Sequence, residues 1–524
     1  MSTIVIPGWA TNDRIPRVVF ALAFGQGDKS PGAAQGYVLF IGSRSYDAAT
    51  GLVAQGTAHA TDPEVLPVYS ASDAADKWGH GSDIHREAVA WFDSYPGAPA
   101  YGVAATKGGG STRASLDMVL GAGTPTASAE MSVYICGTRV PVSVASDTAV
   151  DDVAGDIVAA VNGNADLPMF ASYVLLTNTL TFTWKCFGPS GNAGYVRLAD
   201  IPTGMTSVPS SGNLATGATE PSWSAAYAAA FALDTVFYHV VPATAVIATL
   251  NAGTGNLRGR IQDGLAPTVG KLMDVFVAQC AGESAAATFN DGLDLGTTAY
   301  NEPGYWFTCY WVPNNEVEPW FAAAHWGGME AFEEAVDPQH NWIGLEGGPV
   351  GRLIPPPPLV SSYPTDAELN DAIASGLSPC SYSHRNQTTR LVRSVCSKHL
   401  IGAANDPTYL ENTNVRAVSR VVSYGVRTQL TGEFSGFSAI DDVEGSPPAK
   451  LRSDQTSPLL IKRSLLTYMR GYEEQGWVQN VTAHAAVTNV ERATTPSGRI
   501  LYELPMDVPR WIDAMGGFHR EVGR

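Results

Sequence analysis

The chain has 524 residues and a formal net charge of −18, and 45% of its residues are hydrophobic, including 12 Trp, 20 Tyr and 17 Phe. This apolar content excludes wholesale disorder, and a chain of this length is expected to fold as two to four domains. The 53 Gly and 34 Pro favour turns and strands over a helical bundle.

The charge is distributed unevenly along the chain. Residues 381–524 contain 17 Lys and Arg and 14 Asp and Glu, a net charge of +3, so residues 1–380 carry −21. An acidic bulk argues against non-specific nucleic-acid binding, which needs a basic surface. We therefore expect the acidic part to face solvent and the Arg-bearing C-terminal third to contribute to contacts with other proteins.

The cysteines and the apolar stretches indicate a chain that is made and kept in a reducing compartment. The six cysteines are scattered without a CxxC pair, which is typical of buried small hydrophobic residues; they are Cys136, Cys186, Cys280, Cys309, Cys380 and Cys396. The N-terminal run MSTIVIPGWATNDRIP lacks the pattern of a secretory signal. The most apolar stretch, residues 223–250, is interrupted by Pro242 and polar residues, so we expect a core helix and a buried strand there rather than membrane insertion.

The first hundred residues predict an arm followed by an α/β unit. Ile4, Val5 and Ile6 form a short β-prone run that Pro7 and Gly8 end, and residues 1–20 are interpreted as an N-terminal arm. The segment GYVLFIGS predicts a buried strand, and YGVAAT predicts a second. Between them, Ser82 is a candidate helix N-cap before an apolar stripe that includes Trp91.

Residues 108–205 form the clearest separate module. The runs MSVYICG and RVPVSVAS predict a hairpin with its turn at Gly137-Thr138. Apolar residues at helical spacing predict a helix over 150–161, capped by Thr148 with Asp151 and stopped by Gly163. TLTFTWKC then alternates as a strand. The pattern is β-β-α-β, and we expect a small, self-contained α+β insert.

Helical and strand patterns alternate from residue 220 onward, which predicts an α/β layer with a mostly parallel sheet. TVFYHVVPA, DVFVAQCAG and YWFTCYWVP are the strand candidates. The tetraproline 355–358 indicates a stiff connector, and Thr365 to Glu368 indicate a capping box opening a helix that Gly376 ends.

The C-terminal third is predicted to contain two helices and two strands. TTRLVRSVCSKHL indicates a strand at a sheet edge, residues 406–430 a helix and residues 431–456 a polar loop. Ser457 and Pro458 open a second helix whose apolar face continues to Gly476. VQNVTAHAAVTNVER and GRILYELPM follow as strand-like runs.

A search for catalytic chemistry is negative. The sequence contains no GxSxG, HExxH, Walker A or intact GxGxxG motif; GQGDKSPG and GTGNLRG lack the spacing of a phosphate or dinucleotide loop. His80, Asp83 and His85 could suggest a metal site but lack further ligands nearby.

Two further groups of residues that include glutamates are interpreted as structural. Glu330, Glu333 and Glu334 are interpreted as the solvated face of a helix. Glu302 and Trp306 could suggest a carbohydrate cleft, but an aromatic core strand is favoured. We expect no catalytic, cofactor-binding or metal-binding residues.

The insert resembles the middle domain of Mu-type contractile phage tail sheath proteins. The shared features run in order over residues 131–192: Tyr134-Ile135, Gly137, Arg139 to Val144, Val153 to Val161, Asp166-Leu167-Pro168, Thr181 to Lys185 and Gly191-Asn192. PTDAELNDAIASGLSP, RNQTTRLVRSV and the helix bearing Arg416 and Arg420 resemble the family's C-terminal domain. Cys396, where the family often has Thr, and the long loop at 431–456 depart from it.

The resemblance implies a multidomain, mixed α+β protein, with an α/β core completed by exchanged terminal strands and a small inserted α+β domain. Six regions are expected: an N-terminal arm (1–20), the first part of the core (21–107), an inserted outer domain (108–205), a middle α/β core region (206–360), a C-terminal core domain (361–497) and a C-terminal arm (498–524). Contacts between subunits through the arms are expected at Ile4, Val5, Ile6, Ile500, Tyr502 and Leu504.

The family implies a structural subunit rather than an enzyme. Such subunits stack as hexameric rings around a tail tube and contract to drive the tube through a cell envelope, which implies as partners other copies of the chain, the tube protein, and baseplate and terminator proteins. Lys462, Arg463 and Arg470 are candidate tube contacts. The implied location is the virion tail, after assembly in the host cytoplasm. The sheath of a bacteriocin-like particle or secretion apparatus, an envelope-glycan hydrolase, and a passive adhesin or capsid decoration protein are the alternatives.

Overall fold

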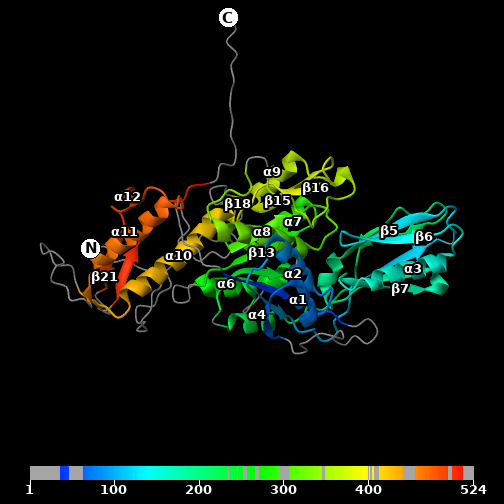
Figure 1. The fold of residues 1–524 in the computed structure, drawn as a ribbon, viewed down its shortest axis with the longest axis horizontal. Coiled ribbons are helices and arrows are strands. Elements are labelled where there is room, and N and C mark those ends of the chain that lie inside the picture. The colour runs from blue at the N-terminus through cyan, green and yellow to red at the C-terminus, as the bar shows by residue number, and fades with distance from the viewer. Residues whose placement is uncertain are drawn as a thin grey trace, which may run out of the picture.

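The computed structural model describes residues 36–46, 63–121, 123–233, 235–244, 246–251, 256–265, 271–294, 306–344, 348–398, 400–401, 404–405, 412–440, 455–493 and 499–510. The fold is mixed α+β and multidomain. Figure 1 shows an elongated arrangement, with a central body, a module containing β5, β6 and α3 at one end, and a helical unit containing α11 and α12 at the other.

An eight-stranded sheet forms the centre of the body, in the order β16-β15-β14-β13-β12-β1-β3-β2. Its six inner strands are parallel: β15 (Leu377–Ser383), β14 (Phe307–Trp311), β13 (Asp274–Gln279), β12 (Phe237–Pro242), β1 (Tyr37–Gly42) and β3 (Ala100–Ala104). The edge strands β2 (Val65–Val68) and β16 (Thr388–Leu391) are antiparallel to their neighbours. The predicted mostly parallel sheet and the edge position of TTRL are confirmed.

Helices cover both faces of this sheet, so its strands are buried on both sides. Alternation along β1 sends Phe40 into one apolar cluster with Trp91, and Leu39 into another with Tyr227. The first cluster includes residues of α1 (Ala71–Trp78), α2 (Asp83–Ser94) and α8 (Pro319–Val336). The second includes residues of α4 (Trp223–Phe231), α5 (Ile247–Asn251), α6 (Leu257–Leu265), α7 (Glu283–Asp294) and α9 (Asp366–Ala374).

Several helix signals in the sequence act as predicted. The Ser82 hydroxyl accepts a hydrogen bond from the His85 N–H at the start of α2. Thr365 and Glu368 form the reciprocal capping box of α9, and Gly376 follows that helix with φ +70°. The predicted cap of the insert helix is wrong, because the N-cap residue of α3 (Val150–Gly163) is Ala149 and the Thr148 hydroxyl donates to the Ala145 carbonyl instead.

The inserted module lies between β3 and β12 in the chain and has more strands than the sequence predicted. One antiparallel sheet contains β10 (Ser207–Val208), β4 (Ser115–Leu120), β8 (Thr179–Trp184) and β7 (Met169–Val174). The other contains β11 (Ser211–Asn213), β9 (Tyr195–Ala199), β5 (Ala129–Ile135) and β6 (Thr138–Val144). The predicted β5–β6 hairpin is confirmed, although its turn residues are Cys136 and Gly137, both with positive φ. The short or half-exposed strands β4, β7, β9, β10 and β11 gave too weak an alternation to be predicted.

The module is not self-contained in its packing. Its core residues, including Trp184, belong to the same continuous apolar cluster as Leu39 of the body. Trp184 meets Trp320 of α8 edge to face, with ring centroids 6.2 Å apart, and Arg197 pairs with Glu316. The expectation of a self-contained insert is therefore wrong, because excision would leave buried body residues without their cover.

A third apolar cluster defines the C-terminal unit. The long helix α10 (Thr413–Phe434) leaves the body and packs its second half against α11 (Pro458–Glu474), and the cluster also takes in residues around α12 (Val481–His484), β21 (Asn489–Arg492) and β22 (Ile500–Glu503). Part of the run 478–492, predicted as strand, is the helix α12, because Asn480 has a positive φ and ends the extended stretch. The described part also contains short pairs and turns: β17 (Leu400–Ile401) with β18 (Ala404–Asn405), β19 (Ser438–Ala439) with β20 (Gln455–Thr456), η1 (Leu175–Thr177), η2 (Pro189–Ala193) and η4 (Val360–Ser362).

Candidate functional site

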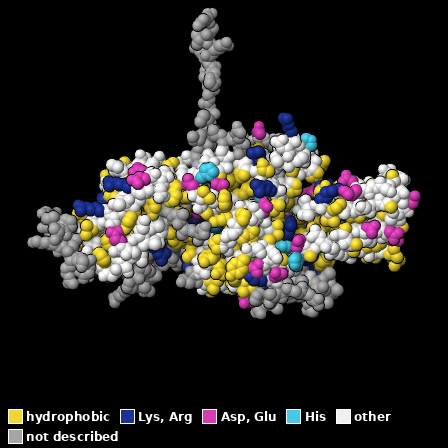
Figure 2. Space-filling model, in the orientation of Figure 1, with side chains coloured by type: hydrophobic (Ala, Val, Ile, Leu, Met, Phe, Trp, Pro, Cys, Tyr) yellow, Lys and Arg dark blue, Asp and Glu magenta, His cyan; other side chains and the backbone are white. Residues whose placement is uncertain are grey.

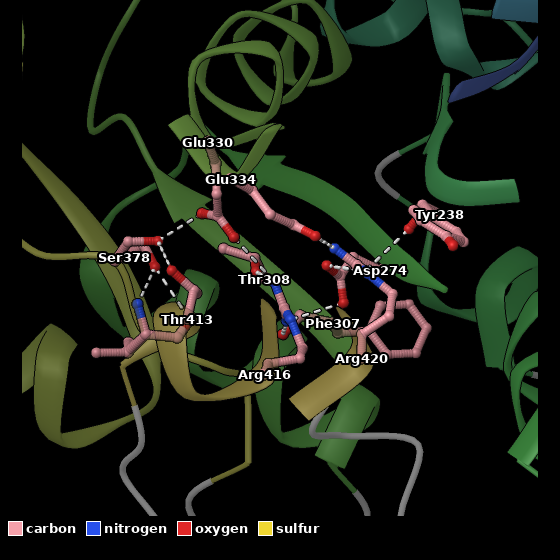
Figure 3. A network of polar contacts seen from close by, with 12 residues as sticks. Tyr238, Asp274, Phe307, Thr308, Glu330, Glu334, Ser378, Thr413, Arg416 and Arg420 are labelled. Carbon is pink, nitrogen blue, oxygen red and sulfur yellow. Dashed lines mark hydrogen bonds and ion pairs between the residues drawn. The ribbon is translucent and has the colours of Figure 1, made fainter. Parts of the chain in front are cut away.

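The first half of α10 crosses the amino-terminal ends of three parallel strands. Arg420 donates to the carbonyl of Tyr238 in β12 at 3.2 Å, and Arg416 donates to the carbonyl of Phe307 in β14 at 3.2 Å. Asp274, the first residue of β13, lies between these positions in the sheet order and faces both arginines (Figure 3). Each arginine thus donates to a carbonyl at the start of a strand, and the Phe307 carbonyl also accepts from the Ser397 N–H at 2.9 Å.

Two arginines and three carboxylates form the centre of this contact. Arg416 pairs through Nε with Asp274 Oδ1 at 2.7 Å and through Nη2 with Glu330 Oε1 at 3.1 Å. Arg420 pairs with both Asp274 and Glu334. All five side chains are at most 7% exposed, so none of the charges has free access to water.

Hydroxyl groups complete the network around Glu330. Its Oε2 atom accepts from the Tyr310 hydroxyl at 3.0 Å and from the Ser394 hydroxyl at 2.8 Å. The Thr413 and Ser394 hydroxyls lie 3.1 Å apart, and Arg416 Nη2 also contacts Thr308 Oγ1 at 2.7 Å. A buried ionic group that is hydrogen-bonded in this way fixes the position of α10 on the sheet, since removing one partner leaves a charge uncompensated.

The network corrects two predictions from the sequence. Glu330 and Glu334 do not lie on a solvated face, because both point from α8 into the body and pair with arginines; Glu333 is half-buried and pairs with His340. Arg416 and Arg420 are 1% and 0% exposed, so these two arginines of the C-terminal third are not surface contacts. Helical spacing could not predict these buried ion pairs, because the paired residues come from elements that are distant in the sequence.

The charges within the network are unequal in number, with one more carboxylate than arginine. Burial raises the pKa of Glu334 to about 6 although Arg420 lowers it, and burial also raises the pKa of Glu330 against the effect of Arg416. The pKa of the neighbouring His239 is held well below its usual value by burial and by the two arginines. A proton shared among the carboxylates would balance the two arginines.

His239, Asp274 and Glu334 are also close enough to share a cation, with ligand atoms within 4.8 Å of one another. The guanidinium of Arg420, however, contacts both carboxylates and supplies the positive charge that a metal ion would bring. We therefore assign this group a structural role in holding α10.

The opposite, carboxyl-terminal edge of the sheet is filled by the inserted module. The strand order reverses between β1 and β12, where α/β folds commonly place a ligand-binding crevice. Here Asp83 packs against Gly42 at the end of β1 and accepts hydrogen bonds from the Ser43 N–H and from Trp184 Nε1, each at 3.3 Å. Cys186 of the module contacts the Ser43 carbonyl at 3.6 Å. The crevice is therefore occupied by side chains of the chain itself.

The three residues near this edge that could suggest a metal site in the sequence do not point toward a common position. His80 pairs with Asp166 at 2.7 Å and is half exposed, whereas His85 accepts a hydrogen bond from the Gly81 N–H at 3.0 Å. Asp83 turns instead toward Ser43 and Trp184. His80 and Asp83 therefore join the body to the module, whereas His85 contacts the body's own backbone. Trp306 is buried directly before β14, whose five residues are all buried, which confirms the aromatic core strand; Glu302 lies outside the described residues.

The candidate tube-contact residues lie on α11, and they differ in exposure and in their contacts. Arg463 and Arg470 are exposed, and no ion pair of either is seen within the described residues. Lys462 is half-buried, and its ammonium donates to the carbonyl of Thr488 within the C-terminal unit. Lys462 therefore contributes to the fold of its own unit.

The candidate arm residues at the C-terminus belong to the chain's own fold. Ile500, Tyr502 and Leu504 pack on the third apolar cluster, and β22 pairs with β21 in antiparallel register. The run therefore has a partner strand and an apolar floor within its own chain, and its expected contacts with other subunits stay a prediction. Ile4, Val5 and Ile6 lie outside the described residues.

Comparisons with known proteins give a structural likeness and no sequence match. No protein-family model and no curated protein matches the chain. Solved structures do match, among them a sheath tail protein from Listeria innocua that is 10% identical, with a TM-score of 0.41, over 92% of this chain and 96% of that one. Within the described residues, no helix has the length and apolar character needed to span a bilayer.

Breaking the buried ionic network between α10 and the sheet should cause a large loss of stability. Arg420→Met leaves Glu334 buried without its cation and leaves Asp274 with Arg416 alone, which should lower the free energy of unfolding by about 3–5 kcal/mol. The exposed Arg470→Met on α11 should change it by less than about 0.5 kcal/mol. Urea unfolding followed by circular dichroism compares the two variants, and equal midpoints would rule out the proposed role of the network.

Asp83, at the contact between the body and the inserted module, predicts how the free energy of unfolding depends on pH. Burial raises the pKa of Asp83 from 3.8 to about 7, against the hydrogen bond from Ser43. The folded state thus holds a proton that the unfolded state releases, and the free energy of unfolding falls as pH rises between these two pKa values, by about 1.4 kcal/mol per pH unit. Asp83→Asn mimics the protonated acid and should remove this slope.

The matched control for that measurement is Asp117→Asn, which changes an exposed carboxylate of the inserted module. Thermal unfolding from acid to neutral pH should give a wild-type slope that Asp117→Asn keeps and Asp83→Asn loses. Parallel profiles for all three proteins would show that Asp83 does not titrate across this range.

Proposed function

We propose that this chain is a structural subunit of a contractile tail sheath, which polymerises as stacked rings around a tail tube and contracts to drive the tube through a target envelope. The ordered motifs of residues 131–192 and of the C-terminal third support this proposal. The protein has no enzymatic role in it. Its partners are other copies of the chain, the tube protein, and the baseplate and terminator proteins, and its place is the virion tail after assembly in the host cytoplasm.

The observation that carries the proposal is the two-stranded sheet of the C-terminal unit. Within the described residues, β21 and β22 form a sheet of two strands, so both are edge strands. Two-stranded sheets are marginal in water, and open edges invite pairing with another chain. Strands donated by neighbouring subunits would complete this sheet and link the subunits while their bodies rotate.

The terminal segments are the source of the donated strands in this proposal. Residues 1–20 contain the β-prone run Ile4 to Ile6, and the chain continues for fourteen residues beyond Arg510. In this proposal β22 accepts a donated strand, because Ile500 and Tyr502 of β22 and the following Leu504 hold it on the third apolar cluster. Exchange of extended segments needs no catalytic or cofactor site.

The exposed face of α11 is the proposed contact with the tube. Arg463 and Arg470 lie on this face with Leu459, which is 43% exposed. Cationic side chains beside an apolar residue suit an acidic partner surface. Because Lys462 is engaged with Thr488, the two arginines carry this contact.

Removing the terminal segments should separate assembly from folding. A cut at Pro505 would damage the C-terminal unit, because Val508 is 1% exposed and Asp507 accepts from the Gln479 N–H at 2.7 Å. Deleting residues 1–16, or residues 511–524, should therefore leave a folded monomer that no longer polymerises. Size-exclusion chromatography beside circular dichroism measures both properties.

Two results of this truncation experiment would contradict the arm-exchange proposal. The first is a truncated protein that elutes as the same large assembly as the full chain, which would make the deleted segment unnecessary for linkage. The second is a truncated protein that loses its folded spectrum, which would make the deleted segment part of its own core.

Charge reversal on α11 tests the tube contact. Arg463→Glu with Arg470→Glu should leave unfolding unchanged, since both side chains are exposed, but should weaken co-sedimentation of the sheath with tube protein. Individual exposed pairs contribute only about 0–1 kcal/mol, so the effect should be modest and largest at low salt. Reversing the exposed Arg385 of the body in the same way is the control, and an equal effect of both variants would refute a specific contact.

A further inference from the structure

The tip of the inserted module carries an unusual row of aliphatic side chains. In the sheet β10-β4-β8-β7, Val208 pairs with Val119, Val119 with Thr179, and Thr179 with Val174. Directly paired residues project to the same face, so these four side chains form one line across the sheet. Leu175 and Leu176 follow Val174 directly and extend this line into η1.

These aliphatic side chains face water rather than a core. Val208 is 71% exposed, Val119 48%, Val174 49%, Leu175 61% and Leu176 97%. The alternate residues Leu120 and Leu180 are buried in the module, so the exposed line lies on the outer face of the sheet. The five exposed residues are called the tip patch below. Contiguous exposed aliphatic surface of this kind marks an interaction site.

The tip patch lies at the end of the module that is farthest from the body. The chain enters and leaves at the other end, where Trp184 N–H donates to the Ala114 carbonyl and Lys185 N–H to the Pro168 carbonyl. From there β4 and β7 run outward and end beside the patch. In Figure 1 the module projects away from the sheet and the C-terminal unit.

Charge is segregated along the module. Asp117 stands two residues before Val119 on the same face, and Asp151, which accepts from the Tyr173 hydroxyl at 2.6 Å, lies close to the end of β7 on the opposite face, where Tyr173 pairs with the buried Leu180. The cations of residues 107–222 lie toward the body: Lys107 and Arg113 stack on Phe187, Lys185 donates to the Ala165 carbonyl, Arg197 pairs with Glu316, and Arg139 follows the hairpin turn that contacts Val317. Figure 2 shows carboxylates, and no Lys or Arg, on the outer end of the module in that view.

We propose that the tip patch is a docking site for a different protein, whose contact surface is apolar and flanked by Lys or Arg. The aliphatic row supplies the apolar contact, and the acidic surroundings favour a cationic rim on the partner. Nucleic acids and anionic lipid surfaces are disfavoured by the same carboxylates. Two tips of this chain would also repel each other, since they bring like charges together.

A pair of labelled peptides tests this inference on the full-length protein. Both have the same Leu-Trp-Leu-Leu centre, but one is flanked by Lys and the other by Glu. Fluorescence anisotropy should show binding of the Lys-flanked peptide and at least about tenfold weaker binding of the Glu-flanked one, a difference of about 1.4 kcal/mol. Leu175→Ser with Leu176→Ser should lose the binding by a similar factor.

The matched control is Leu359→Ser with Val360→Ser, which removes two aliphatic side chains that are 64% and 53% exposed elsewhere on the chain. This variant should bind the Lys-flanked peptide as the unaltered protein does. Circular dichroism confirms that both variants fold.

Four outcomes would overturn the inference. They are no binding of the Lys-flanked peptide, equal binding by the tip variant, tighter binding of phosphatidylglycerol vesicles than of the peptide, and a tip variant that changes only the sedimentation of the protein with itself. The third would indicate a membrane and the fourth a second copy of this chain.

Discussion

The position of α10 on the sheet depends on the buried pairing of Arg416 and Arg420 with Asp274, Glu330 and Glu334. Ionic groups with so little access to water are costly unless every charge is compensated, so the cluster tolerates one arrangement of α8, α10 and the strand ends. Because the second half of the same helix supports α11 and the β21–β22 pair, this arrangement also sets where the C-terminal unit stands on the body. If the chain is the sheath subunit that we propose, this connection would make the C-terminal unit and the body move together.

The inserted module makes the matching contact at the other edge of the sheet. Asp83, Trp184 and Cys186 fill the place where the strand order reverses, and Trp184 packs on Trp320 of α8. Helix α8 thus contacts the module near its start and the α10 network near its end. The sheet lies between the inserted module and the C-terminal unit. The position where α/β folds commonly bind a ligand is here part of the contact with the module. This explains in physical terms why the sequence holds the pattern of an α/β domain without the glycine-rich loop of a nucleotide-binding one.

Local signals in the sequence predicted much of the fold. Buried strands such as GYVLFIG, the β5–β6 hairpin and the capping box at Thr365 are set by neighbouring residues, and the structure confirms them. The candidate site was harder to predict. Glu330 and Glu334 fit a solvated helix face by spacing, and only the return of the chain after a long interval brings Arg416 and Arg420 beside them. The half-exposed strands of the module and the helix α12 were missed because their alternation is weak. Pairing of β22 within its own unit depends on the third apolar cluster, which no short window of sequence contains.

Self-assembly through donated strands is the central claim, and electron microscopy of the purified full-length chain tests it most directly. The account predicts hollow tubes of regularly stacked rings, in which reconstructed density shows extended segments from neighbouring copies beside β21 and β22. Monomers at every concentration, or tubes in which the edges of that two-stranded sheet stay unpaired, would contradict it.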